Sequence, residues 1–422
     1  MKIFQIQCRV VFQVAFGHYK EMRAFNQLKN IFNFSAKNRV FLDFASGTKM
    51  SRKVLKIYRH AKVNFGANPS AIYKEGVLSA LEIEKSRKNI ANLFGAHQDG
   101  VFFTSGATES NNMVIQGVIK SFKKYNQGSP KVLVSPYEHK SITEAVKLSG
   151  AEIIEMPTED NGEIDLKNIK EIINKENIVL VSISFCSNET GMILPLKEIV
   201  KLVRHKRKES GSVFPLVHSD ITHGILNTEI KLDNYGADIL TFGGSKIYGP
   251  KNIGAIITKL GIEIEPILGG GGQESGLRPG TLDVAGVNGL AEAILEAKNN
   301  FGFLRTHNKE LKEFLTAEIA RQKLNVSIIE YKERIDSIIA IVVPKIESEL
   351  LVVELDAKGL AVSSASACTK FSNTPVRAYE VSGVDLKNDG VIRISFGTET
   401  TKGDLKKLVK VLGEIIFKYK DY

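Results

Sequence analysis

A lysine in a glycine-rich turn is the residue of this sequence best suited to covalent chemistry. Lys246 lies in the segment 241–250, TFGGSKIYGP, where a β-prone run ends in two glycines and a Gly-Pro pair closes the turn. Glycines let a backbone approach a ligand closely, and proline fixes the direction in which the chain leaves. The neighbours are small or apolar and include no acid. Desolvation would lower the pKa of such an amine and favour a Schiff base with a carbonyl-bearing cofactor. The alternative is a solvated surface lysine.

Polar residues also follow four other runs that we interpret as strands. They occupy positions 104–108, 138–139, 187–189 and 218–220. Ligands of parallel α/β sheets bind at the carboxyl ends of the strands, so we expect these groups to surround one site together with Lys246.

Such a site would meet the needs of pyridoxal phosphate, which uses a lysine and a protonated ring nitrogen. Asp220 at a strand end is the expected partner of that nitrogen, and His139 could stack on the ring. Asn188 and His223 could donate hydrogen bonds to the ring oxygen.

The phosphate would need donors near a helix N-terminus. The strand-to-helix segment 104–112, TSGATESNN, offers Thr108 and the backbone around Ala107, and Ser245 lies beside the lysine. The alternative for Thr108 is an ordinary helix cap.

Two residues in the last third of the chain complete the predicted site. Arg393 stands alone in the apolar run 391–395 and could bind a substrate carboxylate, although a purely structural arginine is the alternative. Cys368 lies among small residues in the segment 363–370, which is typical of an exposed and reactive thiol. A buried cysteine is the alternative, and Cys186 in an apolar run fits it better.

Composition and charge argue against several classes of function. The chain has 422 residues, 43% of them hydrophobic, and a net charge of +10, with one dense basic run at 204–208 that we interpret as a solvated helix end. We expect no direct nucleic-acid contact and no membrane span. Three cysteines, Cys8, Cys186 and Cys368, suit a reducing, cytoplasmic compartment, and no metal-ligand spacing is present.

Apolar runs that alternate with helical periodicity predict an α/β fold with a mostly parallel sheet, followed by a smaller α+β region. We expect an arm at 38–55 that joins the small domain, a large cofactor-binding domain at 56–300 and a small domain at 301–422 that carries the cysteine. Helices are expected at 284–297 and 311–319. The basic, phenylalanine-rich segment 1–37 could be a targeting peptide, a docking extension, a disordered arm, or sequence upstream of a true start at Met22.

Taken in order, these motifs resemble those of the cysteine desulfurases, in the class-V aminotransferase branch of fold-type-I pyridoxal phosphate enzymes. The motifs that carry the resemblance lie at 104–112, 138–139, 187–191, 218–220, 246–251, 270–281 and 366–368. The resemblance covers residue 40 to the C-terminus. It implies a mostly parallel, seven-stranded sheet in the large domain.

The resemblance also implies a homodimer in which Thr281 reaches the phosphate of the neighbouring subunit. It implies conversion of L-cysteine to L-alanine, with Lys246 moving the Cα proton and Cys368 taking the sulfur as a persulfide. The sulfur would pass to an acceptor protein of iron–sulfur cluster assembly or tRNA thiolation. In this scheme Lys246, Cys368 and His139 are catalytic, and Arg393 and Asn188 bind the substrate.

The sequence departs from the family pattern at several positions. Ser245 replaces a histidine, Gly243 a serine, His223 a glutamine and Phe44 an asparagine, and a Leu-Glu-Pro after the cysteine loop is missing. His223 could influence the cofactor, since imidazole titrates near neutrality. The alternatives are a selenocysteine lyase, another class-V aminotransferase, or a degenerate paralogue that serves as a scaffold.

Overall fold

The computed structural model describes residues 39–229, 231–232, 236–364 and 376–420. Contacts divide the chain into two compact units, Met1–Val40 and Phe41–Tyr422. The second unit carries the site described below, whereas the predicted N-terminal extension lies outside the described residues. Within the described ranges, no helix is both long and apolar enough to cross a membrane.

A seven-stranded sheet forms the centre of the second unit, with the strand order β2-β8-β7-β6-β5-β3-β4. Strand β8 is antiparallel to both of its neighbours, and the remaining pairs are parallel. Strands β5, β7 and β8 are buried at every residue, which explains their continuous apolar runs. The predicted, mostly parallel sheet is confirmed. The strands are β2 (Val101–Thr104), β3 (Lys131–Val134), β4 (Glu152–Glu155), β5 (Ile178–Ser182), β6 (Leu216–Asp220), β7 (Ile239–Gly243) and β8 (Gly254–Thr258).

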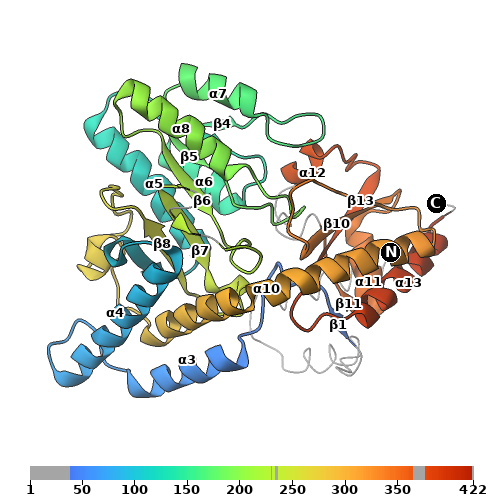
Figure 1. The fold of residues 1–422 in the computed structure, drawn as a ribbon, viewed down its shortest axis with the longest axis horizontal. Coiled ribbons are helices and arrows are strands. Elements are labelled where there is room, and N and C mark those ends of the chain that lie inside the picture. Colours follow the sequence, from blue (N-terminus) through green and yellow to red (C-terminus); the bar gives the residue numbers. More distant parts are fainter. Residues whose placement is uncertain (1–38, 230, 233–235, 365–375, 421–422) are drawn as a thin grey trace, which may run out of the picture. The chain divides into compact units, whose positions relative to one another are not determined.

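Helices cover both faces of this sheet, as Figure 1 shows. Because side chains alternate along a strand, Val132 and Val134 pack into the cluster under α5 and α6. Leu133 between them points to the opposite face and joins the cluster under α4, α7 and α8. The helices are α4 (Lys74–Phe94), α5 (Ala107–Tyr125), α6 (Lys140–Ser149), α7 (Leu166–Lys175) and α8 (Leu196–Ser210).

The basic run at 204–208 lies in the last turns of α8, so the predicted helix end is confirmed. Arg204 and Lys208 are exposed there. Arg207 is not fully solvated, because its guanidinium pairs with the buried carboxylate of Asp238 and its Nε donates to Pro215 O at 2.6 Å.

One long helix replaces the two that the sequence predicts at 284–297 and 311–319. Helix α10 (Val284–Arg321) spans 38 residues without a break. The intervening residues contain no proline, and the buried Leu304, Asn308 and Leu311 continue the helical spacing. Helix α10 packs against α3 (Arg52–Asn64) and α4 near its start and against α13 (Lys402–Lys418). It therefore runs through position 300, and the predicted division into domains there stays a prediction.

The C-terminal region has its own antiparallel sheet, in the order β12-β13-β10-β9. Strands β10 and β13 pair along their full length, with Ala340 opposite Arg393. Leu42 N donates to Ala361 O at 2.8 Å, which attaches the start of the second unit to this region. The elements are β1 (Val40–Phe41), β9 (Ser327–Ile328), β10 (Ile338–Pro344), α11 (Ser348–Ala357), β11 (Leu360–Ala361), β12 (Ser363–Ser364), α12 (Arg377–Val381) and β13 (Asp389–Ser395).

Candidate active site

Lys246 ends a single 3₁₀ turn, η3 (Gly244–Lys246), that follows directly on β7. Its amine donates a hydrogen bond to the carbonyl oxygen of Ser46. The carbonyl oxygen of Ser245 accepts from Thr48, at 2.9 Å from the backbone N and 3.1 Å from Oγ1. The lysine turn is thus held against a segment that lies about two hundred positions earlier in the chain.

Asp220 ends β6, next to β7, and its carboxylate is held by two donors. Thr222 N donates to Oδ1 at 2.9 Å, and Asn111 Nδ2 donates to Oδ2 at 2.9 Å. Asn111 comes from α5, so the position of the carboxylate depends on a helix that covers one face of the sheet.

His139 is the N-cap of α6. Its Nδ1 accepts from Ser141 N at 3.1 Å and lies 2.8 Å from Ser141 Oγ. The residue keeps a solvent-exposed edge. The protein packed around the ring lowers the pKa of His139, with Asp220 acting in the opposite direction and Lys246 in the same direction. The charges of Asp220 and Lys246 therefore both act on this imidazole, which places the three predicted residues around one centre.

His223 belongs to the same centre. It lines a cavity together with Lys246, Thr222 and Asn227. Burial, followed by the charges of Lys246 and Arg393, holds the pKa of His223 well below its usual range. The expectation that this imidazole titrates near neutrality is therefore wrong, because the surrounding cations and the loss of solvent keep it neutral.

Glu138, next to His139, is a buried carboxyl group. Its two oxygens accept from Ser184, at 2.5 Å from the backbone N and 2.5 Å from Oγ. Burial raises the pKa of Glu138 to about 8, although the Ser184 donors act against the shift. This group can hold a proton at neutral pH beside the predicted stacking histidine.

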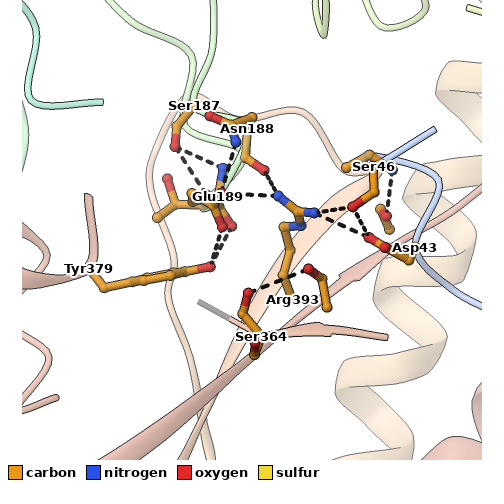
Figure 2. Close-up of polar contacts among 12 residues, drawn as sticks. Asp43, Ser46, Ser187, Asn188, Glu189, Ser364, Tyr379 and Arg393 are labelled. Carbon is orange, nitrogen blue, oxygen red and sulfur yellow. Dashed lines mark hydrogen bonds and ion pairs between the residues drawn. The ribbon is translucent and has the colours of Figure 1, made fainter. Parts of the chain in front are cut away.

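Arg393 lies in the middle of β13 with 3% of its side chain exposed, surrounded by acceptors as Figure 2 shows. Nη1 donates to Asn188 O at 3.0 Å and to Glu189 Oε1 at 3.1 Å. Nη2 donates to Asp43 Oδ1 at 3.1 Å and to Ser46 Oγ at 2.8 Å. Nε is buried and has no hydrogen-bond partner among the described residues.

Charge balance explains how a guanidinium is tolerated there. Burial alone would lower the pKa of Arg393, but the charges of Glu189 and Asp43 outweigh it and raise the pKa. Burial raises the pKa of Glu189, while Arg393 and a 2.9 Å hydrogen bond from Tyr379 Oη act in the opposite direction. Asn188 Nδ2 also donates to Glu189, at 2.8 Å, so the predicted substrate-binding Asn188 and Arg393 meet at one carboxylate.

The N-terminus of α5 approaches the lysine turn closely. Ala107 begins α5 after Gly106, whose φ of 143° suits glycine. An ideal Cβ on Gly243 would lie only 3.0 Å from Ala107 N, so glycine at 243, in place of the family's serine, permits this approach. The first N–H groups of a long helix therefore lie beside Gly243, two positions before Ser245, and Thr108 in the first turn of that helix is exposed.

The described residues fit pyridoxal phosphate by the chemistry of their donor set. An amine, a carboxylate with two orienting donors, an imidazole and a helix N-terminus are what an aldehyde, a ring nitrogen, an aromatic ring and a phosphate require. The described residues include no group of three or more histidine, cysteine or carboxylate side chains that could hold a metal ion. Thr281 is exposed in the glycine-rich segment, so its predicted role stays a prediction. Cys368 lies outside the described residues.

Comparison with known proteins defines the family. The sequence model described as aminotransferase class-V matches residues 40–408, so the chain belongs to that family. The chain is 33% identical over 388 residues to the cysteine desulfurase IscS of Dictyoglomus turgidum, covering 90% of this chain and 95% of that protein. It is also 33% identical over 357 residues to the mitosomal cysteine desulfurase of Encephalitozoon cuniculi, covering 82% and 79%. These relatives place the chain among the cysteine desulfurases of the family.

The fold agrees with this assignment. A solved NifS-like protein superposes with a TM-score of 0.82 at 27% identity, covering 90% of this chain and all of the other. The fold class predicted from the sequence, an α/β fold of fold type I, is therefore confirmed.

Sequence reasoning gave no role to several residues that hold the site together. They are Asp43, Ser46, Thr48, Asn111, Glu138, Glu189 and Tyr379. Asn111 and Glu189 lie inside the motifs at 104–112 and 187–191, in the segments that follow β2 and β5, so their position was a usable signal. Tyr379 carries no such local signal, because its partner lies 190 positions away.

Proposed function

We propose that this enzyme is a cysteine desulfurase that uses pyridoxal phosphate to convert L-cysteine to L-alanine, with Cys368 receiving the sulfur. The single observation that supports this most is that Asp220 ends β6 and Lys246 closely follows the neighbouring β7, while Asn111 and Ser141 link the Asp220 carboxylate to His139. The bound cofactor would supply an electron sink for the pair left at Cα when its proton is removed.

Substrate binding falls to Arg393 and Asn188. The Nε of Arg393 is a buried donor with no partner among the described residues, and a substrate carboxylate could accept from it. The carboxylate could gain a second hydrogen bond by replacing Ser46 Oγ or Asp43 at Nη2. Because the same Ser46 accepts from the Lys246 amine, carboxylate binding at Arg393 would act directly on the segment that holds the lysine.

The proton transfers fall to three groups. Lys246 would take the proton from Cα of the substrate. Asp220 would keep the ring nitrogen protonated, since its carboxylate already accepts from two neutral donors. His139 would face the ring, with Nδ1 occupied by Ser141.

Sulfur transfer falls to Cys368. Its thiolate would attack the sulfur of the substrate and form an S–S bond. The bond between Cβ and sulfur of the substrate would break, and its electron pair would stay on Cβ. Protonation of that carbon gives alanine, and Cys368 keeps a persulfide. Cys186 is unsuited to this role, because burial raises the pKa of its thiol.

We propose a homodimer as the active form. Apolar side chains that are 43–97% exposed at the start of α4 support it. They are Ile72, Tyr73, Val77, Leu78 and Leu81, here called the α4 patch. A patch of this kind on a folded chain is typical of a protein–protein interface. Sedimentation of wild-type protein as a dimer and of Leu81→Asp as a smaller species would support it, whereas a monomeric wild type would contradict it.

The activity is tested by loading the protein with pyridoxal phosphate and measuring alanine and sulfide from L-cysteine with a thiol reductant. Wild type and Cys186→Ala should form alanine, whereas Cys368→Ala and Lys246→Ala should not. Alanine formation by Cys368→Ala at the wild-type rate would contradict the proposal. Activity of Cys368→Ala on selenocysteine would instead identify a selenocysteine lyase that does not need Cys368.

A persulfide must be passed on, so we propose a sulfur-acceptor protein of iron–sulfur cluster assembly or tRNA thiolation as the partner. Relatives that carry the name IscS support the first of these. Transfer of labelled sulfur from the loaded enzyme to an iron–sulfur scaffold protein, but not to serum albumin, would distinguish this partner from a nonspecific thiol.

A further inference from the structure

Asn111 is a buried amide that connects three elements of the site by hydrogen bonds. The residue is 0% exposed and comes from α5. Its Nδ2 donates to Asp220 Oδ2 and to Ser141 Oγ, each at 2.9 Å, and its Oδ1 accepts from Thr241 Oγ1 at 2.5 Å. One side chain thus contacts β6, α6 and β7, with both of its polar atoms in use.

The amide requires Asp220 to act as an acceptor. An amide nitrogen only donates, so Oδ2 of Asp220 must accept. Thr222 N, also only a donor, occupies Oδ1. Both oxygens of Asp220 therefore act as acceptors in this arrangement.

The second contact of the amide fixes its orientation. Since Oδ1 of Asn111 only accepts, the hydroxyl proton of Thr241 points to it, and Thr241 Oγ1 must accept from His218 Nε2, 2.9 Å away. His218 Nδ1 then accepts from Ser182 Oγ at 2.9 Å. Burial lowers the pKa of His218 to about 4, so the ring is neutral at neutral pH. A proton on Nε2 satisfies the hydrogen bonds of this ring with both Thr241 and Ser182.

A rotated amide would require a different set of protons. Oδ1 of Asn111 would face Asp220 Oδ2, and two acceptors can share that contact only if Asp220 is protonated. Thr241 would then accept from the amide and donate to His218 Nε2, which would move the His218 proton to Nδ1. The tautomer of His218 therefore reports the orientation of the Asn111 amide, and with it whether Asp220 Oδ2 faces a donor.

The third contact of the amide determines the proton of His139. Because Asn111 donates to Ser141 Oγ, the Ser141 hydroxyl is left to donate to His139 Nδ1, and Ser141 N donates to the same atom. With two donors at Nδ1, a neutral His139 carries its proton on Nε2. The imidazole then offers an N–H, and not a lone pair, on the side away from α6.

We propose that Asn111 is a positioning residue that orders the protons of the site, holding Asp220 as an acceptor and the proton of His139 on Nε2. The role that this gives to Asp220 and His139 toward the cofactor rests on the proposed function, but the tautomers do not. Other titratable groups act electrostatically on Asp220 or His139. They are Glu138, Cys186, His218, Lys140, His223 and Lys246.

The tautomers can be read by solid-state ¹⁵N NMR of protein loaded with pyridoxal phosphate and labelled at its eight histidines. His139→Asn and His218→Asn assign the two signals. In wild type at neutral pH both rings should carry the proton on Nε2. A wild-type His218 signal from the Nδ1-protonated tautomer would overturn the proposal, whatever the turnover of cysteine.

Asn111→Leu tests the amide directly, with Asn112→Leu as the matched control on the same helix. Among the described residues, the Asn112 side chain bonds to neighbouring turns of α5, at Thr108 O and Gln116. In Asn111→Leu, we expect mixed tautomers at His218, a shifted pH profile of the cofactor's visible absorbance, and alanine formation reduced roughly tenfold or more, the loss expected when a hydrogen bond to a charged group is removed. Tautomers and absorbance equal to those of Asn112→Leu would overturn the proposal.

Thr241→Val keeps the test decisive if Asn111→Leu does not fold, because valine matches threonine in shape. It removes the acceptor of His218 Nε2, so the His218 proton should move to Nδ1 and donate to Ser182. A His218 proton that stays on Nε2 in this variant would count against the network. If wild-type protein shows the expected tautomers but forms no alanine, the result would count only against the proposed function.

Discussion

The guanidinium of Arg393 and the carboxylate of Glu189 form an ion pair inside the protein, with 3.1 Å between Nη1 and Oε1. Their side chains are only 3% and 11% exposed, and they come from positions 204 residues apart. The pair joins the strand that would bind the substrate carboxylate to a strand end of the main sheet. It therefore ties the C-terminal sheet to the main sheet, and under the proposed function it would also orient the arginine that binds substrate.

Arg393→Lys should raise KM for L-cysteine by roughly tenfold to a hundredfold with a smaller change in kcat, because lysine cannot form a two-pronged contact with a carboxylate. Steady-state kinetics measure both constants. The matched control is Arg334→Lys, since Arg334 is equally buried but donates to the carbonyl oxygens of Ile329 and Ile338. It should lower stability and leave KM unchanged, and equal KM values in the two variants would disprove substrate binding by Arg393.

Glu189→Gln should destabilise the protein by roughly 2–4 kcal/mol, because it leaves a buried guanidinium with Asp43 as its remaining ionic partner. Urea unfolding measures the change. Glu330→Gln is the control, since Glu330 also pairs with an arginine but is 47% exposed, and its loss should cost under about 1 kcal/mol. Equal losses in the two variants would show that burial does not matter here.

Glu138 should make stability depend on pH. Burial raises the pKa of Glu138 to about 8, above the ordinary value of 4.5, so the stability that its protonated form contributes is complete below about 4.5 and is lost as the pH rises through about 8. Glu138→Gln should remove this pH dependence, which is roughly 5 kcal/mol between those limits. Thermal melts across the pH range check it against Glu144→Gln, which alters an exposed side chain of α6. Parallel curves for wild type and Glu138→Gln would refute the assignment.

His223→Gln restores the family's residue and should leave the pH profile of the cofactor's visible absorbance unchanged between about pH 6 and 9. The reason is that burial and neighbouring cations hold the pKa of His223 well below its usual range, so the ring does not titrate in this window. Absorbance titrations of the two proteins measure this. A profile that loses a transition in His223→Gln would show that the imidazole does ionise there.

Much of the fold could be predicted from the sequence because its strands are continuous apolar runs. Strand β4 was missed because its sequence, EIIE, is flanked by charges and half-exposed. The two helices expected at 284–297 and 311–319 are one, because the residues between them contain no proline and continue the helical spacing of buried positions.

The sequence pattern of polar groups after strands located Asp220 and Lys246 at the ends of neighbouring strands, where the structure has them, and their roles stay predictions. The pattern failed for contacts that depend on packing between distant segments. The bond from Lys246 to Ser46 joins residues 200 positions apart, and no local pattern announces it. The neutral state of His223 was also beyond reach, because it depends on burial beside cations that only the fold brings together.

The most direct measurement of the central claim is mass spectrometry of the peptide that contains Cys368 after one turnover with L-cysteine and no reductant. The account predicts one extra sulfur atom on that peptide, none on the Cys186 peptide, and an amount of alanine equal to the persulfide. Alanine formed without sulfur on the Cys368 peptide would contradict it.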